Sequence, residues 1–326
     1  MKKSSTALKY SIGLDLGGTK LATALVDSRG NILEYNKFPL EINKTKSPQE
    51  AKKKVISFMQ SACEDYKRRY PTQTSAKNFM GIGLASAGPL NIKTGELIDP
   101  SNFKDWKRFK IVQELTSALK KINWQPKIYF QNDAIASAFA EKWIGAAKNC
   151  KSFVVVTVGT GIGTGVIFNG LPCQTEGMGS EWGHLLVDVK GMQQHKSMIT
   201  EHTVEGIASG TALLKRAKAL GFKGSSVEEL VVENEQTTQY KILFDDMAWA
   251  LAALCYSLSM GFHFDKILFS GGLIKIKHLY WEQTKKIYSD MIRQRNPAFL
   301  APIAVAKAGN KAGVVGAASL PYLLRN

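Results

Sequence analysis

Short apolar runs, separated by glycine-rich turns, occupy the first part of the chain. Residues 10–16 form a mostly apolar run typical of a buried strand, and two glycines and a threonine follow at 17–19. A second run at 20–26 ends in the turn at 27–30, and a third segment covers 31–37. This pattern predicts a three-stranded meander at the beginning of the fold.

The next segment changes to a helical period. Apolar residues recur every three or four positions between Ala51 and Ala62, which predicts a helix over residues 47–69. Ser47 and Glu50 have the spacing of a capping box at its start. Further apolar periods predict strands at 79–85 and 127–131 and a helix at 134–143.

The opening pattern then recurs. A β-branched strand is predicted at 152–158, a glycine loop at 159–165 and a returning strand at 166–168. Two halves that each begin with strand, glycine loop and strand indicate duplicated half-domains. Later segments predict a helix at 238–260, strands at 266–270 and 302–305, and a closing helix at 311–324. The alternation of strands and helices indicates an α/β protein, and 326 residues favour two domains.

Composition narrows the functional classes. Neither a signal peptide nor a run of about 20 apolar residues is visible, so we expect no membrane partner. The four cysteines form no CxxC pair, which fits a cytoplasmic protein. The net charge of +16 comes mainly from lysines scattered in small groups, which is typical of a solvated surface and also suits a site that attracts phosphates.

Two glycine-rich turns are candidates for phosphate binding. In the first, Asp15 precedes Gly17, Gly18, Thr19 and Lys20, and glycines there would let backbone N–H groups approach phosphate oxygens. The second has four glycines within residues 159–165, more than a hairpin requires, but it matches neither a P-loop nor a dinucleotide fingerprint. The first turn, taken alone, is also explained as a tight hairpin.

Two polar groups are candidates for substrate chemistry. Asn132 and Asp133 follow a predicted strand, where a carboxylate could accept a proton from an attacking hydroxyl, although Asp133 could equally cap the next helix. Glu181, His184 and Glu205 offer hydrogen-bond acceptors suited to sugar hydroxyls. A glutamate and a histidine near one another are also common in ordinary structural hydrogen bonds.

Taken in order, these motifs resemble the ROK family (repressor, open reading frame, kinase), which contains bacterial glucokinases, fructokinases and N-acetylhexosamine kinases. The resemblance runs from residues 12–20 to residues 312–318. Between them lie the further motifs Ser86-Ala87-Gly88-Pro89, Asn102 with Trp106, Asn132-Asp133-Ala134, the loop at 159–165, Glu181-x-Gly183-His184, Glu205 with Ala208-Ser209-Gly210, and Ser270-Gly271-Gly272.

The resemblance implies a two-domain actin/hexokinase-like (ribonuclease H-like) α/β fold with an interdomain cleft. The smaller domain would comprise residues 1–132 with the closing helix at 311–326, and the larger one residues 133–310. The expected cofactors are ATP and Mg²⁺, and the expected partners are a small sugar and a second copy of the chain, with no nucleic acid.

The resemblance also implies residue roles. Asp133 would be the general base. The sugar would be held by Gly88, Asn102, Asn132, Glu181, His184 and Glu205. Phosphates and nucleotide would be held by Asp15, Gly17, Gly18, Thr19, Lys20, Thr160, Gly161, Gly271 and Gly272, with Asp15 also as a magnesium ligand.

One departure from the family concerns a structural zinc site made of a histidine and three cysteines. The cysteine positions, counted back from Glu205, are occupied by Lys196, Met198 and Thr203, none of which can replace a thiolate. We therefore expect no structural zinc, with His184 free to bind sugar. An unusual site of His184, His195 and His202 remains an alternative. A smaller departure is Ile135, where many members have asparagine.

The activity that we expect is transfer of phosphate from ATP to a hexose hydroxyl, with glucose as the first choice. N-acetylhexosamine or fructose remain alternatives for the acceptor, and polyphosphate remains an alternative donor. A non-catalytic sugar sensor is a further possibility. A repressor is disfavoured because Asp15 stands too near the start of the sequence to leave room for a helix-turn-helix domain before it.

Overall fold

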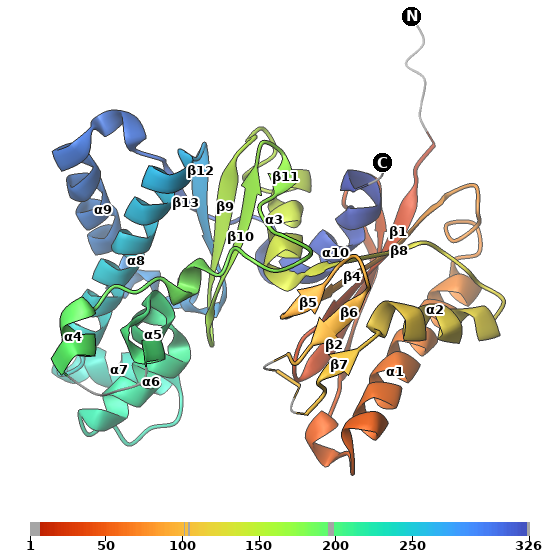
Figure 1. Ribbon diagram of the computed structural model, residues 1–326, viewed down its shortest axis with the longest axis horizontal. Coiled ribbons are helices and arrows are strands. Elements are labelled where there is room, and N and C mark those ends of the chain that lie inside the picture. Colours follow the sequence, from red (N-terminus) through yellow and green to blue (C-terminus); the bar gives the residue numbers. More distant parts are fainter. Residues whose placement is uncertain (1–6, 101, 104, 195–198, 325–326) are drawn as a thin grey trace, which may run out of the picture. The chain divides into compact units, whose positions relative to one another are not determined.

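The computed structural model describes residues 7–100, 102–103, 105–194 and 199–324. They divide into two compact units. The first comprises the described residues of Met1–Asn149, Cys173–Gly179 and Lys307–Asn326, and the second comprises Cys150–Pro172 and those of Ser180–Ala306. Each unit is built around its own five-stranded sheet (Figure 1).

The sheet of the first unit has the strand order β3-β2-β1-β4-β8. The strands β1 (Tyr10–Leu16), β2 (Lys20–Asp27) and β3 (Ile32–Pro39) form the predicted antiparallel meander. Strands β4 (Phe79–Ser86) and β8 (Ile128–Asn132) run parallel to β1. The carboxyl ends of β1, β4 and β8 therefore lie at one edge of the sheet, where α/β folds place reactive side chains.

One face of this sheet is covered by α1 (Pro48–Arg69) and α2 (Ile111–Lys121). Leu14 on β1, Val55 on α1 and Leu115 on α2 belong to one fully buried cluster. The apolar side of α1 was predicted from its period, and the predicted Ser47 cap accepts a hydrogen bond from Glu50 N at 3.2 Å. A small sheet of β5 (Leu90–Asn91), β6 (Glu96–Ile98) and β7 (Arg108–Phe109) adjoins this layer.

The other face carries α3 (Asp133–Trp143) and α10 (Ala312–Leu323), which pack against each other (Figure 1). Glycines allow α10 to approach the sheet closely. A Cβ atom on Gly13 would lie 2.1 Å from Val314 O, and one on Gly83 would lie 1.7 Å from Ala317 O. Both contacts are with backbone atoms, so no other residue fits at these two positions without moving the helix.

The second unit repeats this strand order as β11-β10-β9-β12-β13. Strands β9 (Phe153–Val158) and β10 (Ile162–Phe168) are antiparallel, and β11 (Leu171–Pro172) extends that side. Strands β12 (Lys266–Ser270) and β13 (Ile303–Val305) run parallel to β9. The internal repeat predicted from the two glycine turns is thus a repeat of sheet topology.

The helices of the second unit surround a long apolar helix, α8 (Lys241–Phe262), which packs against α5 (Val204–Ala208), α6 (Gly210–Ala219) and α9 (Trp281–Arg295). The remaining helices are α4 (Val189–Gln194), α7 (Val227–Thr237) and 3₁₀ turns, including Trp182–His184, Ile199–His202 and Gly272–Leu279. In the described part of the chain α8 alone is long and apolar enough to cross a membrane, but 61% of its apolar window is buried, as expected of a core helix.

Two predicted boundaries differ from the structure. The glycine loop expected at 159–165 is shorter, because β10 begins at Ile162 and its Gly163 and Gly165 pair with β9. The domain boundary expected after residue 132 also differs, since α3 belongs to the first unit. The reason is close packing, because a Cβ atom on Gly316 of α10 would lie 1.8 Å from Ala136 O of α3.

Candidate functional site

Asp15 and the first glycine turn lie at the carboxyl end of β1. Gly17 N donates to Lys20 O at 3.0 Å, which closes the hairpin between β1 and β2, and Thr19 and Lys20 are exposed beside it. Gly18 approaches Asn102 closely, since a Cβ atom on Gly18 would lie 3.1 Å from Asn102 Cβ. The structure thus brings a predicted phosphate residue and a predicted sugar residue together.

Asn132 and Asp133 lie where β8 ends and α3 begins. Asn132 caps the helix, because its Oδ1 accepts from Ala134 N at 2.9 Å and from Ile135 N at 3.3 Å. Asp133 Oδ1 also accepts from Ala134 N, at 2.8 Å. Since the cap is made mainly by Asn132, Asp133 keeps its second carboxylate oxygen for another partner.

The carboxyl groups of Asp15 and Asp133 influence one another. Burial and then the neighbouring Asp133 carboxylate raise the pKa of Asp15 to about 7, with Lys20 acting in the opposite direction. Burial also raises the pKa of Asp133, against the lowering effect of its hydrogen bonds to backbone N–H groups. Two carboxyl groups with raised pKa values at one sheet edge are typical of a functional site.

Gly88 completes this cluster of the first unit. A Cβ atom on Gly88 would lie 3.6 Å from Asn132 Nδ2, so Gly88 lies beside the Asn132 amide. The edge of this unit therefore carries Asp15, Gly18 and Asn102 on one side and Gly88, Asn132 and Asp133 on the other.

The second glycine turn, at residues 159–161, joins β9 to β10. Gly159 N donates to Gly161 O at 2.9 Å, and Thr160 is exposed at the tip. The start of α6 holds the turn, since Gly210 N donates to Gly159 O at 2.8 Å and Thr211 N donates to Thr160 O at 3.2 Å. These bonds fix the backbone of the turn without using its side chains.

Glu205 contacts the same turn. Its Oε2 accepts from Ile162 N at 2.7 Å, and a Cβ atom on Gly161 would lie 2.6 Å from that oxygen. A predicted sugar residue is therefore bonded directly to the predicted phosphate turn. Only a glycine at position 161 leaves room for this contact, which the sequence did not reveal.

The segment with Glu181 and His184 is anchored on β10. Trp182 N donates to Thr164 Oγ1 at 3.0 Å, and the Trp182 ring meets the Phe262 ring edge-on with centroids 5.5 Å apart. Gly183 is buried against β10, where a Cβ atom would lie 2.2 Å from Ile162 O. Glu181 and His184, on either side of this anchor, are exposed.

Gly271 and Gly272 follow β12 and lie beside the second turn. Gly271 has φ +96°, and a Cβ atom there would lie 2.3 Å from Val158 O, so glycine is required both by conformation and by space. Thr157 Oγ1 and Ser270 Oγ, 3.0 Å apart, join the ends of β9 and β12. This edge of the second unit therefore presents two adjacent glycine segments.

His202 and Thr203, which lie at or beside the expected zinc positions, are held by contacts with other protein groups. His202 is buried and its Nδ1 lies 2.9 Å from Asp188 Oδ2, while Thr203 caps α5. In the described residues, no three or more His, Cys, Asp or Glu side chains gather to hold a metal ion. Lys196, Met198 and His195 lie outside the described residues, so the three-histidine alternative stays untested.

Two groups near the site were not predicted. A Cβ atom on Gly313 of α10 would lie 2.3 Å from Asp15 Oδ2, so this glycine makes room for the carboxylate. Gln131 Oε1 accepts from Asn132 N at 2.8 Å and from Gln174 Nε2 at 2.9 Å, which braces the end of β8. Both depend on contacts between residues more than 40 positions apart, and no local pattern reveals such contacts.

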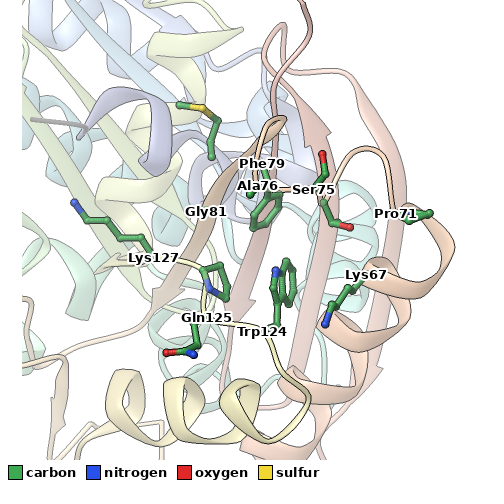
Figure 2. A pocket seen from close by; sticks show the side chains of 12 residues that line it. Lys67, Pro71, Ser75, Ala76, Phe79, Gly81, Trp124, Gln125 and Lys127 are labelled. Carbon is green, nitrogen blue, oxygen red and sulfur yellow. The ribbon is translucent and has the colours of Figure 1, made fainter.

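A cavity of about 420 Å³ in the first unit lies away from this cluster (Figure 2). Its lining includes Phe79, Gly81 and Trp124, near the amino ends of β4 and β8, with Lys67 and Lys127 at its rim. The candidate residues lie at the opposite, carboxyl edge of the sheet. The cavity is therefore separate from the candidate site.

The fold and the site together define the class of protein. It has two α/β units with the same sheet topology, and each unit has a glycine turn at one edge of its sheet. The model of the ROK family matches residues 11–322, and the chain belongs to this family.

The chain is similar to proteins of known name over nearly its whole length. It is 26% identical to the glucokinase of Thermotoga maritima, covering 95% of this chain and 96% of that protein. It is 27% identical to the fructokinase of Zymomonas mobilis, covering 95% of each. Among solved structures, the ROK hexokinase from Thermus thermophilus matches with a TM-score of 0.80 and 27% identity, covering 97% of this chain and 98% of that one. The two-unit α/β fold is therefore that of the ROK hexokinases.

Proposed function

We propose that this sugar kinase transfers the γ-phosphoryl group of ATP to a hydroxyl of a hexose. The observation that carries the proposal is the pair of carboxyl groups, Asp15 and Asp133, at the carboxyl edge of one sheet with raised pKa values. The similarity to a glucokinase, a fructokinase and a hexokinase over nearly the whole chain supports it.

In this proposal Asp133 is the general base. A sugar hydroxyl that attacks phosphorus must release its proton, and a carboxylate with a raised pKa accepts it more readily than an ordinary aspartate. Asn132 makes the helix cap and leaves an oxygen of Asp133 directed to other partners. The rest of catalysis is positioning and charge stabilisation, as is usual in phosphoryl transfer.

The remaining hydroxyls of the sugar are assigned to the other predicted sugar residues, namely Gly88, Asn102, Asn132, Glu181, His184 and Glu205. Glutamate and histidine side chains that are exposed or half-buried in the free protein are able to accept hydrogen bonds from a ligand. A sugar that lacks one of these hydroxyls would leave a side chain of the site without its hydrogen bond, and this cost allows the site to discriminate between sugars.

The phosphates are assigned to the two glycine turns. Gly17, Gly18, Thr19 and Lys20 form one turn, and Thr160 and Gly161 form the other. Open backbone N–H groups in such turns bind phosphate oxygens. Gly271 and Gly272, which lie beside the second turn, are assigned to the adenosine side.

The donor set also fits a magnesium ion. Burial and, after it, the neighbouring Asp133 carboxylate raise the pKa of Asp15, and a divalent cation there would stabilise the charged carboxylate against both effects. Asp15 would hold the ion directly or through water. When bound, magnesium neutralises charge on the phosphates of ATP.

Glucose is our first choice of acceptor, and the similarity to a glucokinase supports it. The similarity to a fructokinase keeps fructose as a second candidate. We also propose that the enzyme acts in the cytoplasm, where ATP is available, and as a homodimer, which light scattering would test.

A coupled assay of ADP release tests the proposal. MgATP is offered with glucose, mannose, fructose, N-acetylglucosamine or N-acetylmannosamine, and sugar-dependent turnover with one of them is expected. Absence of turnover with all five, while the protein is folded, would overturn the proposal. The same panel with polyphosphate in place of ATP tests the other donor.

A further inference from the structure

The predicted sugar residues His184 and Glu205 lie directly before and after the segment of residues 185–204, whose two ends are hydrogen-bonded to each other. Just inside them, Val204 N donates to Leu185 O at 2.9 Å and Val187 N donates to His202 O at 2.9 Å, around a bridge between Leu186 and Thr203. The two ends of the segment are thus joined by a short antiparallel ladder. His184 precedes this ladder by one residue and Glu205 follows it by one residue.

A side-chain pair reinforces the ladder. His202 is 6% exposed, and its Nδ1 lies 2.9 Å from Asp188 Oδ2. Asp188 Oδ1 accepts from Gly191 N of α4 at 2.8 Å, so one carboxylate joins the start of α4 to His202. A Cβ atom on Gly191 would lie 1.9 Å from Asp188 Oδ2 and 2.8 Å from His202 Cε1, which shows how closely the three residues are packed.

Apolar packing does not replace this pair. A cavity of about 840 Å³ borders the segment and is lined by Asp188 and His202 among others. Leu186, Val189 and Ile199 are 40%, 56% and 60% exposed, so their side chains contribute little burial. These three side chains therefore do little to hold the two ends of the segment together, and loss of the Asp188 hydrogen bond at the buried His202 imidazole would be costly.

We propose that the Asp188–His202 hydrogen bond is a clasp that positions His184 relative to Glu205 for sugar binding. Asp188 and His202 are positioning residues, because they act through the ladder and not on the substrate. The Glu205 end is also fixed independently, by the Thr203 cap of α5 and by the bond from Ile162 N. Opening the clasp should therefore displace His184 more than Glu205. The inference rests on the proposed sugar-kinase function.

The test compares two substitutions of His202 in the full chain. His202→Leu keeps the volume and removes the donor, whereas the amide Nδ2 of His202→Asn reaches close to the place of the imidazole Nδ1. For His202→Leu we expect the KM for the accepted sugar to rise about ten-fold or more, the scale of a lost charge-assisted hydrogen bond. The KM for ATP should stay within about two-fold, and His202→Asn should restore most of the sugar KM.

The control is His278→Leu. His278 also pairs with a carboxylate, its Nε2 lying 3.1 Å from Glu235 Oε1, but both side chains are about half exposed and lie outside the segment. Its KM values should stay at the wild-type level. Equal rises of the sugar and ATP KM in His202→Leu, or no difference between His202→Leu and His202→Asn, would overturn the positioning role.

Hydrogen exchange separates failure of this inference from failure of the proposed function. In His202→Leu the amides of Val187 and Val204 should exchange faster, while those of β9 and β12 should not change. Faster exchange confined to the segment supports the clasp even if no sugar is phosphorylated, an outcome that would overturn the proposed function alone. Unchanged exchange at both amides would overturn the clasp, whatever the activity.

Discussion

The carboxylate of Glu205 accepts a hydrogen bond from the backbone N–H of Ile162 at 2.7 Å. This single contact joins a residue proposed to bind sugar to the turn proposed to bind phosphate. The two are 43 positions apart in sequence, and Gly161 leaves the space for the contact. If both proposed roles hold, this contact couples sugar binding to phosphate binding within one unit.

Substitution of Glu205 should affect both substrates. Glu205→Ala removes the acceptor for Ile162 N, and we expect the KM values for sugar and ATP each to rise about ten-fold or more. Glu205→Gln keeps an acceptor oxygen, so its ATP KM should stay near that of the wild type while its sugar KM rises. Steady-state kinetics with each substrate varied in turn checks this. An unchanged ATP KM in Glu205→Ala would show that the contact does not support the turn.

Asp133→Asn should separate binding from turnover. The amide has nearly the same shape but accepts a proton poorly, so kcat should fall by about 10²- to 10⁴-fold. Sugar affinity, measured by calorimetry without ATP, should change little. Asp65→Asn serves as the control, because Asp65 lies on α1 and pairs with Arg68 and Arg69 at the surface. Nearly full turnover in Asp133→Asn would remove this residue as the base.

Asp15→Asn should stabilise the free protein above neutral pH. The pKa of Asp15 is raised to about 7 in the folded state, so the unfolded chain loses this proton first as the pH rises from about 4. Folding stability from this group therefore falls between about pH 4 and pH 7 and then levels off. The variant avoids this loss of folding stability. The loss is roughly 4 kcal/mol at most, because one pKa unit is worth about 1.4 kcal/mol.

Urea unfolding at pH 4.5 and pH 8 measures this effect. The gain of Asp15→Asn over the wild type should be several-fold larger at pH 8. An equal gain at both pH values would mean that the carboxyl group does not titrate as described.

Two glycines at the contact between α10 and the sheet, Gly83 on β4 and Gly313 on α10, should have different roles. Gly83→Ala would place a Cβ atom 1.7 Å from Ala317 O, a backbone atom that cannot yield without moving the helix. We expect a loss of several kcal/mol of stability, or no folded protein. Gly313→Ala would meet the Asp15 carboxylate instead, at 2.3 Å, and a side chain can rotate away. Its Tm should change little while turnover falls about ten-fold or more, because Asp15 is displaced. Thermal unfolding and the coupled assay together distinguish the two.

Selective removal of zinc and of magnesium should have different effects on the protein. A zinc-selective chelator should leave both Tm and turnover unchanged, since three of the expected zinc positions carry Lys196, Met198 and Thr203. Removal of magnesium with EDTA should abolish turnover, and added magnesium should restore it. A fall of Tm with the zinc chelator would point to a metal bound by other residues.

Local patterns in the sequence were sufficient to predict the first meander, the strand–glycine turn–strand of the second unit and the helix α1, whose Ser47 cap is present in the structure. They were not sufficient for the small sheet β5–β7, because strands of two or three residues carry too short a period. The approach of Gly313 to Asp15 depends on residues nearly 300 positions apart and has no local signal. The motifs named the candidate residues, whereas only the fold revealed which of them are bonded to one another.

The position of α10 in the chain has a consequence for synthesis. Strands β1 and β4 emerge from the ribosome early, but the helix that covers their second face comes after the whole second unit. Until then the surface around Gly13 and Gly83, against which α10 packs, is incompletely covered, whereas domains tend to fold in the order of synthesis. The first unit is thus among the last parts to be completed. A stalled chain that ends before α10 should be a preferred substrate for chaperones.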